Sequence, residues 1–283
     1  MFRHLHHSGK ARCTEHLPHA HEPDINLSIR VVTICCKLYN VRELVKPDPL
    51  EFLYSYDDPA DREIAGLVAS GLAYGRVEQI VKSVGRVLDV LGPAPSAFLS
   101  DTSRRSLSAL LGDFRHRFTT GGEMAAFLSA VSSLQAEGGG SVQCVFAGAG
   151  NAVEAMEPFA REALSRDSSG RCTLLPKPSC GSACKRLNLF LRWMVRRDEV
   201  DPGGWTCLSP ADLLVPLDVH MHRAGRALGM TSREQGDMRT VLEITEGFRK
   251  LRPDDPVRYD FAITRFGIRR ELTLSSLLEL LEL

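Results

Sequence analysis

The strongest constraint on this chain is a helical spacing of apolar residues that recurs along most of its length. Ile64, Leu67, Val68 and Leu72 recur every three or four residues, which is the stripe of an amphipathic helix. Strictly alternating runs are rare, so a sheet is not expected to organise the fold. The pattern predicts an all-α protein. Further stripes predict helices over 77–91, 124–134, 154–165, 185–197, 219–228, 236–251, 255–266 and 273–282.

Capping residues suggest where the helix around Ile64 begins and ends. Asp61 is the predicted N-cap, because its carboxylate can accept the free amides of a first turn. Gly75 is the predicted stop, because glycine readily adopts the left-handed backbone that ends many helices. Glycine and proline also end the next two stripes, at Gly92-Pro93 and at 138–140.

Composition and charge limit the classes of protein to which this chain can belong. The 283 residues are enough for one large domain or two lobes, and 43% hydrophobic with 25% charged residues is typical of a soluble protein. Basic and acidic residues number 35 each. A histone-like binder needs a basic excess and is excluded, whereas an enzyme that holds a few phosphates is not. No apolar stretch approaches a membrane span and no signal peptide is visible, so a cytoplasmic protein without membrane partners is expected.

The first 37 residues differ from the rest, because six of the nine histidines lie there without helical periodicity before Leu27. We expect residues 1–37 to be a disordered tail or an addition from an upstream start codon. Metal binding by this tract, with Cys13, is the alternative. The eight cysteines are expected to be reduced thiols. Four of them are too irregularly spaced to predict a metal site, namely Cys172, Cys180, Cys184 and Cys207.

The helix predicted over 185–197 is a candidate site of chemistry because it lies between two loops. It contains five basic residues and no acid. Lys185 falls in its first turn, where the helix dipole disfavours a cation, and a neutral lysine amine is a nucleophile. The alternative is an ordinary surface lysine. The amides around Gly181 and Ser182 are candidate phosphate contacts, as are Arg186, Arg192 and Arg196.

A second candidate is Asp218, in the segment Pro216-Leu217-Asp218-Val219-His220. Leu217, Met221, Ala224 and Leu228 follow the spacing of a helix that is buried on one side. Asp218 therefore falls at the N-cap. The alternatives are a carboxylate that only caps the helix, and one that also faces a cleft and stabilises positive charge.

These residues resemble the helix-hairpin-helix DNA glycosylases. Pro216-Leu217-Asp218 followed by a helix with Arg223 is similar to the segment carrying their catalytic aspartate, and Gly181 to Lys185 is similar to that carrying their lysine nucleophile. The separation of Lys185 and Asp218 is similar to that in the archaeal 8-oxoguanine glycosylase branch. The resemblance implies a DNA repair glycosylase with lyase activity, which removes an oxidised purine from damaged duplex DNA without a cofactor.

Two departures from this superfamily bear on the expectation. Cys180-Gly181-Ser182-Ala183-Cys184 stands where its hairpin has Gly-apolar-Gly, so a weaker phosphate contact is expected. No cysteine follows Cys207, so the iron–sulfur cluster of the endonuclease III branch is not expected. The region from Lys46 onward also resembles an uncharacterised bacterial family placed in this superfamily. The shared stretches are 61–64, 72–76, 187–197, 201–203 and 255–261.

By this resemblance, residues 38–283 form a two-lobed unit with a cleft between the lobes. Lobe one covers about 61–214, and lobe two combines 38–60 with 215–283. A displaced base needs a slot lined by aromatic and polar groups. The candidate lining residues are Tyr74, Arg76, Trp193, Trp205 and His220, with core packing as the alternative. The alternative functions are a non-catalytic nucleic-acid-binding protein of this fold and an enzyme acting on another ribosyl bond.

Overall fold

The computed structural model describes residues 25–165 and 174–268, and most of these residues are helical. The all-α fold class predicted from the sequence is confirmed. The predicted helix over 273–282 lies outside the described residues. The α-helices are α1 (Ile25–Tyr39), α2 (Pro59–Gly71), α3 (Val77–Leu91), α4 (Pro95–Asp101), α5 (Arg104–Leu110), α6 (Gly121–Glu137), α7 (Ala152–Ser165), α8 (Lys185–Val195), α9 (Val219–Ala227), α10 (Met238–Leu251) and α11 (Asp260–Ile268). Short 3-10 helices are η1 (Arg42–Leu44), η2 (Pro49–Ser55), η3 (Val142–Val145), η4 (Pro178–Cys180) and η5 (Pro210–Asp212).

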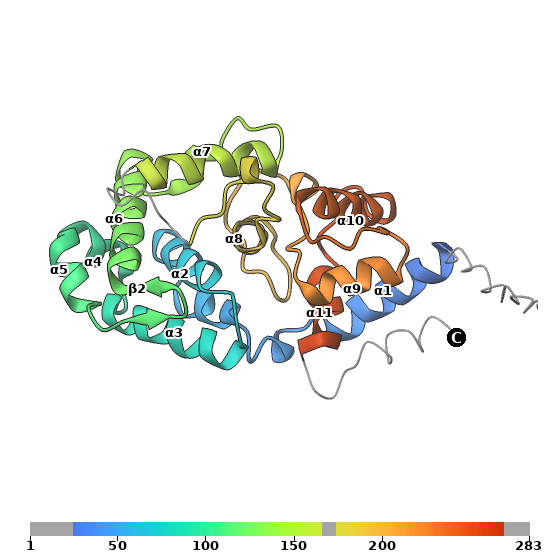
Figure 1. The fold of residues 1–283 in the computed structure, drawn as a ribbon, viewed down its shortest axis with the longest axis horizontal. Helices are drawn as coiled ribbons and strands as arrows, with labels where there is room; N and C mark the ends of the chain where they lie inside the picture. The colour runs from blue at the N-terminus through green and yellow to red at the C-terminus, as the bar shows by residue number, and fades with distance from the viewer. Residues whose placement is uncertain (1–24, 166–173, 269–283) are drawn as a thin grey trace, which may run out of the picture.

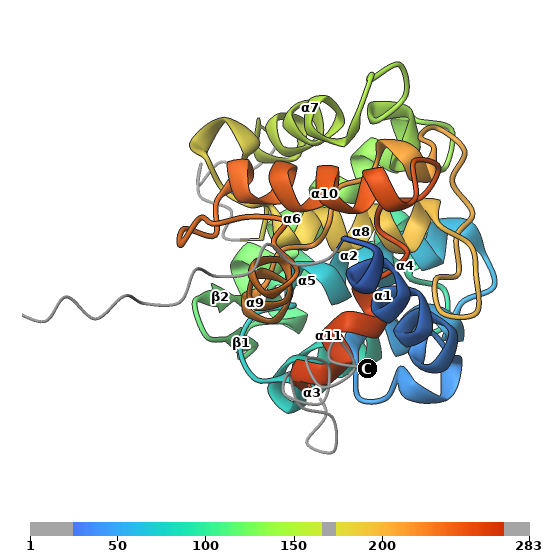
Figure 2. The ribbon, with the colours of Figure 1, turned by 90° about the vertical axis from the view of Figure 1, so that its right-hand side faces the viewer.

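The helices form two groups with α8 between them (Figure 1). Helices α2 to α6 lie on one side of α8, and α1, α9, α10 and α11 lie on the other. Contacts join α8 to α2, and α11 to both α1 and α9. Figure 2 shows α10 crossing above α9 and α11 on the second side. The lobe boundaries proposed at residues 61 and 214 stay a prediction.

Helix α2 is the centre of the first group. Every residue from Glu63 to Gly71 is buried, so this helix is covered on all sides and not along one stripe alone. Its N-cap is Asp58, followed by Pro59 at the first helical position, and the prediction of Asp61 as the cap is wrong. The Asp61 carboxylate instead accepts the amide of Ser96 at the start of α4. The helix ends before the predicted stop at Gly75.

The helical unit begins earlier than predicted. Residues 25–39 form α1, which packs against α11, and Val31, Val32 and Cys35 are buried. The prediction of a tail up to residue 37 is therefore wrong for residues 25–37. Burial of these apolar side chains against a distant helix explains the error, because the partner surface is not visible from the local sequence. Residues 1–24 lie outside the described residues.

A two-stranded hairpin interrupts the helices between α5 and α6. Strands β1 (Arg115–His116) and β2 (Thr119–Thr120) pair antiparallel, with Arg115 opposite Thr120 and His116 opposite Thr119. Thr120 then caps α6 in a reciprocal capping box with Glu123. Buried His116 holds the hairpin to the rest of the molecule, because its ring nitrogens bond Ser83 Oγ at 2.9 Å and Tyr74 O at 3.0 Å.

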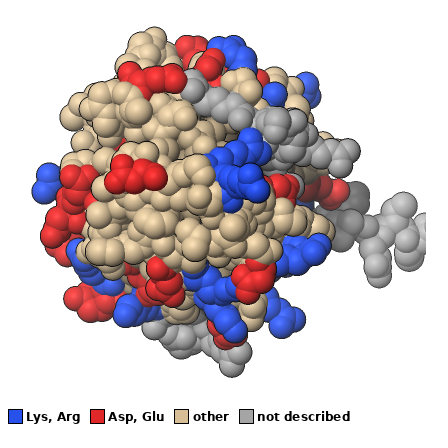
Figure 3. Space-filling model, turned by 90° about the vertical axis from the view of Figure 1, so that its left-hand side faces the viewer, with Lys and Arg blue, Asp and Glu red and all other residues tan. Residues whose placement is uncertain are grey.

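The surface at the α4 and α5 end of the molecule carries both signs of charge (Figure 3). Basic and acidic side chains alternate there around a broad uncharged area. This distribution matches the formal net charge of zero and gives this face no attraction for a polyanion. Among the described residues, no helix is long and apolar enough to span a bilayer.

Candidate active site

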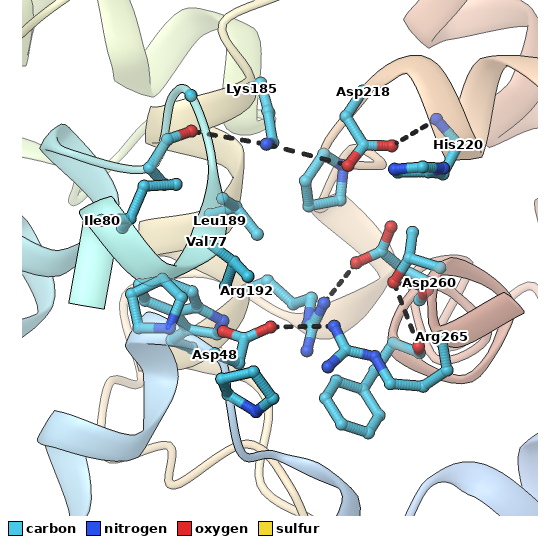
Figure 4. A pocket seen from close by; sticks show the side chains of 18 of the residues that line it. Asp48, Val77, Ile80, Lys185, Leu189, Arg192, Asp218, His220, Asp260 and Arg265 are labelled. Atoms are coloured by element: carbon cyan, nitrogen blue, oxygen red, sulfur yellow. Dashed lines mark hydrogen bonds and ion pairs between the residues drawn. The ribbon is translucent and has the colours of Figure 1, made fainter. Parts of the chain in front are cut away.

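A cavity of about 740 Å³ lies between the two groups of helices. Figure 4 shows Lys185 and Asp218 on one side of it and the charged residues Asp48, Arg192 and Asp260 on the other. Its walls combine charged and apolar side chains. The lining residues are Pro47, Asp48, Pro49, Ala73, Gly75, Arg76, Val77, Glu78, Ile80, Lys185, Leu189, Arg192, Trp193, Pro216, Asp218, His220, Asp260, Phe261, Thr264 and Arg265.

Lys185 is the first residue of α8, as predicted. The turn before it is left-handed at Gly181 and at Cys184, whose φ is 47°. A non-glycine residue adopts this conformation at an energetic cost of about 1 kcal/mol, so the surrounding contacts hold it there. One such contact is the Cys184 amide, which donates to Ser182 Oγ at 3.2 Å. The chain therefore enters α8 with the Lys185 side chain directed into the cavity (Figure 4).

The Lys185 amine has two polar neighbours at the cavity surface. Nζ donates to the carbonyl oxygen of Ala73 at 3.4 Å and lies 3.7 Å from Asp218 Oδ2. Ala73 belongs to the turn between α2 and α3, and Asp218 belongs to the start of α9. The lysine side chain remains about one third exposed. Three separate segments thus position one amine at the cavity surface.

Asp218 divides its two carboxylate oxygens between two tasks. Oδ1 accepts the amides of His220 and Met221, each at 2.9 Å, so the predicted N-cap of α9 is confirmed. Oδ2 faces Lys185. The cap fixes the side-chain rotamer, and the second oxygen is thereby held toward the amine. Asp218 therefore caps α9 and also faces the cavity, whereas its role in stabilising positive charge stays a prediction.

The far side of the cavity is formed by a buried ionic network. Arg192 binds Asp201 through Nε and Nη2 and binds Asp260 through Nη1. Burial lowers the pKa of Arg192, but the charges of Asp201 and Asp260 outweigh it, and the net pKa is raised. Burial raises the pKa of Asp260 to about 6, against the opposing charge of Arg192 and with the added charge of Asp218.

The prediction that Arg192 and Arg196 contact DNA is wrong. Arg192 is 2% exposed and Arg196 is 5% exposed, so both side chains are almost completely buried. Arg196 binds Asp198, Asp201 and Asp255. A guanidinium whose donors are taken by buried carboxylates cannot bind a phosphate. These two arginines join α8 to the loop after it and to the segment before α11.

The other predicted phosphate contacts are also engaged within the protein. The Gly181 amide donates to Pro178 O at 2.9 Å, and the Gly181 carbonyl oxygen accepts the amide of Met238, the first residue of α10, at 3.3 Å. Ser182 forms an isolated β-bridge with Asp237. Arg186 donates to Gly71 O at 3.2 Å and lies over the ring of Tyr74. The amides of Gly181 and Cys184 are therefore not free for a phosphate.

The residues predicted to line a base pocket separate into two sets. Arg76, Trp193 and His220 line the cavity, although Trp193 is 1% exposed. Tyr74 turns toward the hairpin, where its hydroxyl donates to His116 O at 2.8 Å. Trp205 lies in the core, and its Nε1 donates to buried Glu63 Oε1 at 2.8 Å. The prediction of Tyr74 and Trp205 as lining residues is wrong.

Four charged lining residues were not predicted, namely Asp48, Glu78, Asp260 and Arg265. Asp48 caps η2 through Oδ1 and accepts Arg265 Nη2 through Oδ2 at 2.8 Å. The sequence does contain a signal for Asp260, because an arginine that is buried with an apolar helix needs a carboxylate partner from another segment. The distance along the chain between α8 and α11 hides which carboxylate that is.

Cysteine chemistry does not compete with Lys185 in this site. Cys184 precedes the lysine but is 1% exposed, and burial raises the pKa of its thiol to about 11. A thiol that stays protonated at neutral pH is a poor nucleophile. Across residues 25–165 and 174–268, no three His, Cys, Asp or Glu side chains are grouped to hold a metal ion.

Comparison with known proteins shows the family of this chain. No curated protein and no solved structure matches it. One protein family matches residues 48–269, a range that holds all the cavity-lining residues except Pro47. Because this match covers well over half of the chain, the protein belongs to the family described as "Protein of unknown function (DUF2400)".

Proposed function

We propose that this protein is a DNA base-excision glycosylase with abasic-site lyase activity, in which Lys185 is the nucleophile. The observation that carries the proposal is the 3.7 Å approach of Lys185 Nζ to Asp218 Oδ2 inside a cavity of about 740 Å³. An amine beside a carboxylate is the pair needed to attack a sugar carbon and to manage the proton that the attack releases. The resemblance to helix-hairpin-helix glycosylases suggests the same pair of residues.

The chemistry follows from the two functional groups. The neutral Lys185 amine attacks C1′ of the sugar, the C1′–N bond breaks, and the base leaves with its electron pair and takes a proton from solvent. Asp218 accepts the proton that Lys185 Nζ loses after its bond to C1′ has formed. It returns this proton to the ring oxygen as the C1′–O4′ bond breaks, which leaves a protonated imine. Loss of a proton from C2′ then expels the 3′ phosphate and cuts the strand.

Asp218 has a second role before the covalent step. Breaking the bond to the base develops positive charge on the sugar, and a fixed carboxylate nearby stabilises that charge. The two capping bonds to the α9 amides hold Asp218 in one rotamer. A carboxylate that is already oriented does not have to reorganise during the reaction.

The size and lining of the cavity suit a base that has left its stack. A cavity of about 740 Å³ is within the range of small-molecule sites. Its apolar walls include Leu189, Trp193 and Phe261, and its polar groups include Arg76 and His220. A flipped base is recognised by such a combination of flat apolar surface and hydrogen-bonding groups.

An enzyme that acts on another ribosyl bond is the second candidate. The charge balance of the cavity favours this second candidate, since four acidic and four basic side chains line the walls and their formal charges cancel. A site for duplex DNA is expected to carry a local basic excess. A smaller nucleoside or nucleotide substrate requires fewer phosphate contacts. The lysine and aspartate would have the same roles in that reaction.

The test is borohydride trapping on duplexes that carry 8-oxoguanine or an abasic site. The wild-type protein should form a covalent adduct with the abasic duplex. Lys185→Arg should form none, because arginine keeps the positive charge beside Asp218 but cannot form the imine. Lys82→Ala is the matched control, because this exposed lysine of α3 does not line the cavity. An adduct that persists in Lys185→Arg would contradict the proposal, whereas absence of any adduct in the wild type would favour the second candidate.

A further inference from the structure

Asp260 lies in the cavity wall with one carboxylate oxygen engaged and the other without a partner. Oδ2 accepts Arg192 Nη1, and Oδ1 has no hydrogen-bond partner among the described residues. The side chain is 3% exposed. Figure 4 shows the two oxygens pointing apart, one toward Arg192 and the other toward the side where Asp218 lies. A buried polar atom without a partner is uncommon and calls for a physical explanation.

The ionic network holds this carboxylate in place. Arg192 is fixed by Asp201 through Nε and Nη2, so only Nη1 remains for Asp260. Asp201 is in turn bound by Arg196. Asp260 is the member of this network that reaches the cavity together with Arg192, whereas Asp201 and Arg196 do not line it. The free oxygen therefore occupies a fixed position on the cavity wall.

Burial and charge define what that oxygen can recognise. Burial raises the pKa of Asp260 to about 6, so most molecules carry an ionised carboxylate at neutral pH. An ionised carboxylate oxygen accepts hydrogen bonds and donates none. The neighbouring wall is apolar at Leu189, Trp193 and Phe261. A ligand atom that donates to Oδ1 would satisfy it, and one with a lone pair would be repelled.

We infer that Asp260 determines the specificity of the cavity, by selecting heterocyclic bases that direct an N–H donor at its free carboxylate oxygen. This inference rests on the proposed function and names the class of base that the site accepts. A buried acceptor rejects a ligand without the donor strongly, because both partners then lose hydrogen bonds on desolvation. Asp260 therefore contacts the base, and Lys185 and Asp218 act on the sugar.

The variant Asp260→Asn tests the polarity of this position. Arg192 Nη1 is a donor, so the amide oxygen of asparagine will take the place of Oδ2. The amide NH₂ group then occupies the position of the free oxygen. The substitution thus replaces an acceptor by a donor at nearly constant shape, and the preference for N–H donors should be lost.

The experiment measures excision under single-turnover conditions from duplexes that carry 8-oxoguanine, hypoxanthine, uracil or purine. The first three bases have a ring N–H, whereas purine joined at N9 has none. Each excision rate is divided by the rate of borohydride trapping on a preformed abasic duplex, which presents no base. Asp255→Asn is the matched control, because Asp255 binds Arg196 in the same network but does not line the cavity.

In the wild type, the N–H base excised fastest should exceed purine at least tenfold, and Asp260→Asn should reduce this ratio at least tenfold. Asp255→Asn should change it less than twofold. An equal fall in both variants, or no fall in Asp260→Asn, would overturn the inference, as would a wild type that excises none of the N–H bases. Absence of trapping by the wild type on abasic DNA would refute the proposed function itself and the inference with it.

Discussion

The Lys185 amine lies 3.7 Å from the Asp218 carboxylate, and the two residues come from the first turn of α8 and the N-cap of α9. Each helix start supplies one partner, and both side chains line the cavity. The remaining oxygen of Asp218 is used as a helix cap. One carboxylate therefore links the stability of α9 to the chemistry of the site, and substitutions can separate these two contributions.

Asp218→Asn should reduce the rate of borohydride trapping at least about 100-fold, which is the usual size of a lost electrostatic contact in a transition state. Unfolding free energy should change by less than about 0.5 kcal/mol, because asparagine caps helices about as well as aspartate. Asp218→Ala should add a loss of about 1 kcal/mol in stability. Urea denaturation and trapping, measured on both variants, check this. Equal stability losses in the two variants would contradict the capping account.

Arg192→Met should destabilise the fold by about 3 to 5 kcal/mol, because it leaves the buried carboxylates of Asp201 and Asp260 without their shared partner. Urea denaturation measures the loss. Arg105→Ala, at an exposed arginine of α5, is the control and should change stability by less than about 0.5 kcal/mol. A small loss in Arg192→Met would mean that the network contributes little to the fold.

Asp260 should make stability depend on pH between about 4 and 6. Its pKa is about 6 in the folded chain and about 3.9 in an unfolded one, so unfolding releases a proton in this window. The stabilisation that protonated Asp260 contributes to the fold is therefore fully present below about pH 4 and is lost as the pH rises to 6. Asparagine does not titrate. The stability of Asp260→Asn relative to wild type should rise by roughly 2 to 3 kcal/mol from pH 4 to pH 7.

Chemical denaturation of both proteins at pH 4 and pH 7 checks this shift. Asp198 is a second titrating carboxylate in the network, and it behaves in the opposite sense. Burial raises its pKa, but the charge of Arg196 and backbone hydrogen bonds outweigh this and lower it to about 2. The stabilisation that ionised Asp198 contributes is lost only as the pH falls below about 4, and it is the same in wild type and in Asp260→Asn. A constant difference between Asp260→Asn and wild type would contradict the assignment.

Arg76 is the exposed arginine of the cavity wall, at the N-cap of α3. If DNA is the substrate, Arg76→Ala should weaken binding of an abasic duplex and reduce the slope of log affinity against log salt by about 1. Fluorescence anisotropy at several salt concentrations measures both quantities. Arg105→Ala serves again as the control, since Arg105 does not line the cavity. An unchanged salt slope would place the phosphate contacts elsewhere.

Local patterns in the sequence predicted the positions of Lys185 and Asp218, because each depends on one helix and its cap. Local patterns could not predict that α1 packs against α11, nor that Arg192 and Arg196 are buried. A basic residue on an apolar helix has the same local pattern whether it faces solvent or a buried carboxylate. Its partners Asp255 and Asp260 come from a distant segment. The pairing depends on tertiary packing, which no local pattern encodes.

The central claim is that Lys185 forms the covalent bond to the sugar. The most direct measurement is mass spectrometry of the borohydride-reduced adduct after proteolysis, with an abasic duplex as substrate. The account predicts a sugar remnant on the peptide that contains Lys185, and none on the peptide that contains Lys82. A remnant on another lysine, with Lys185 unmodified, would contradict the account.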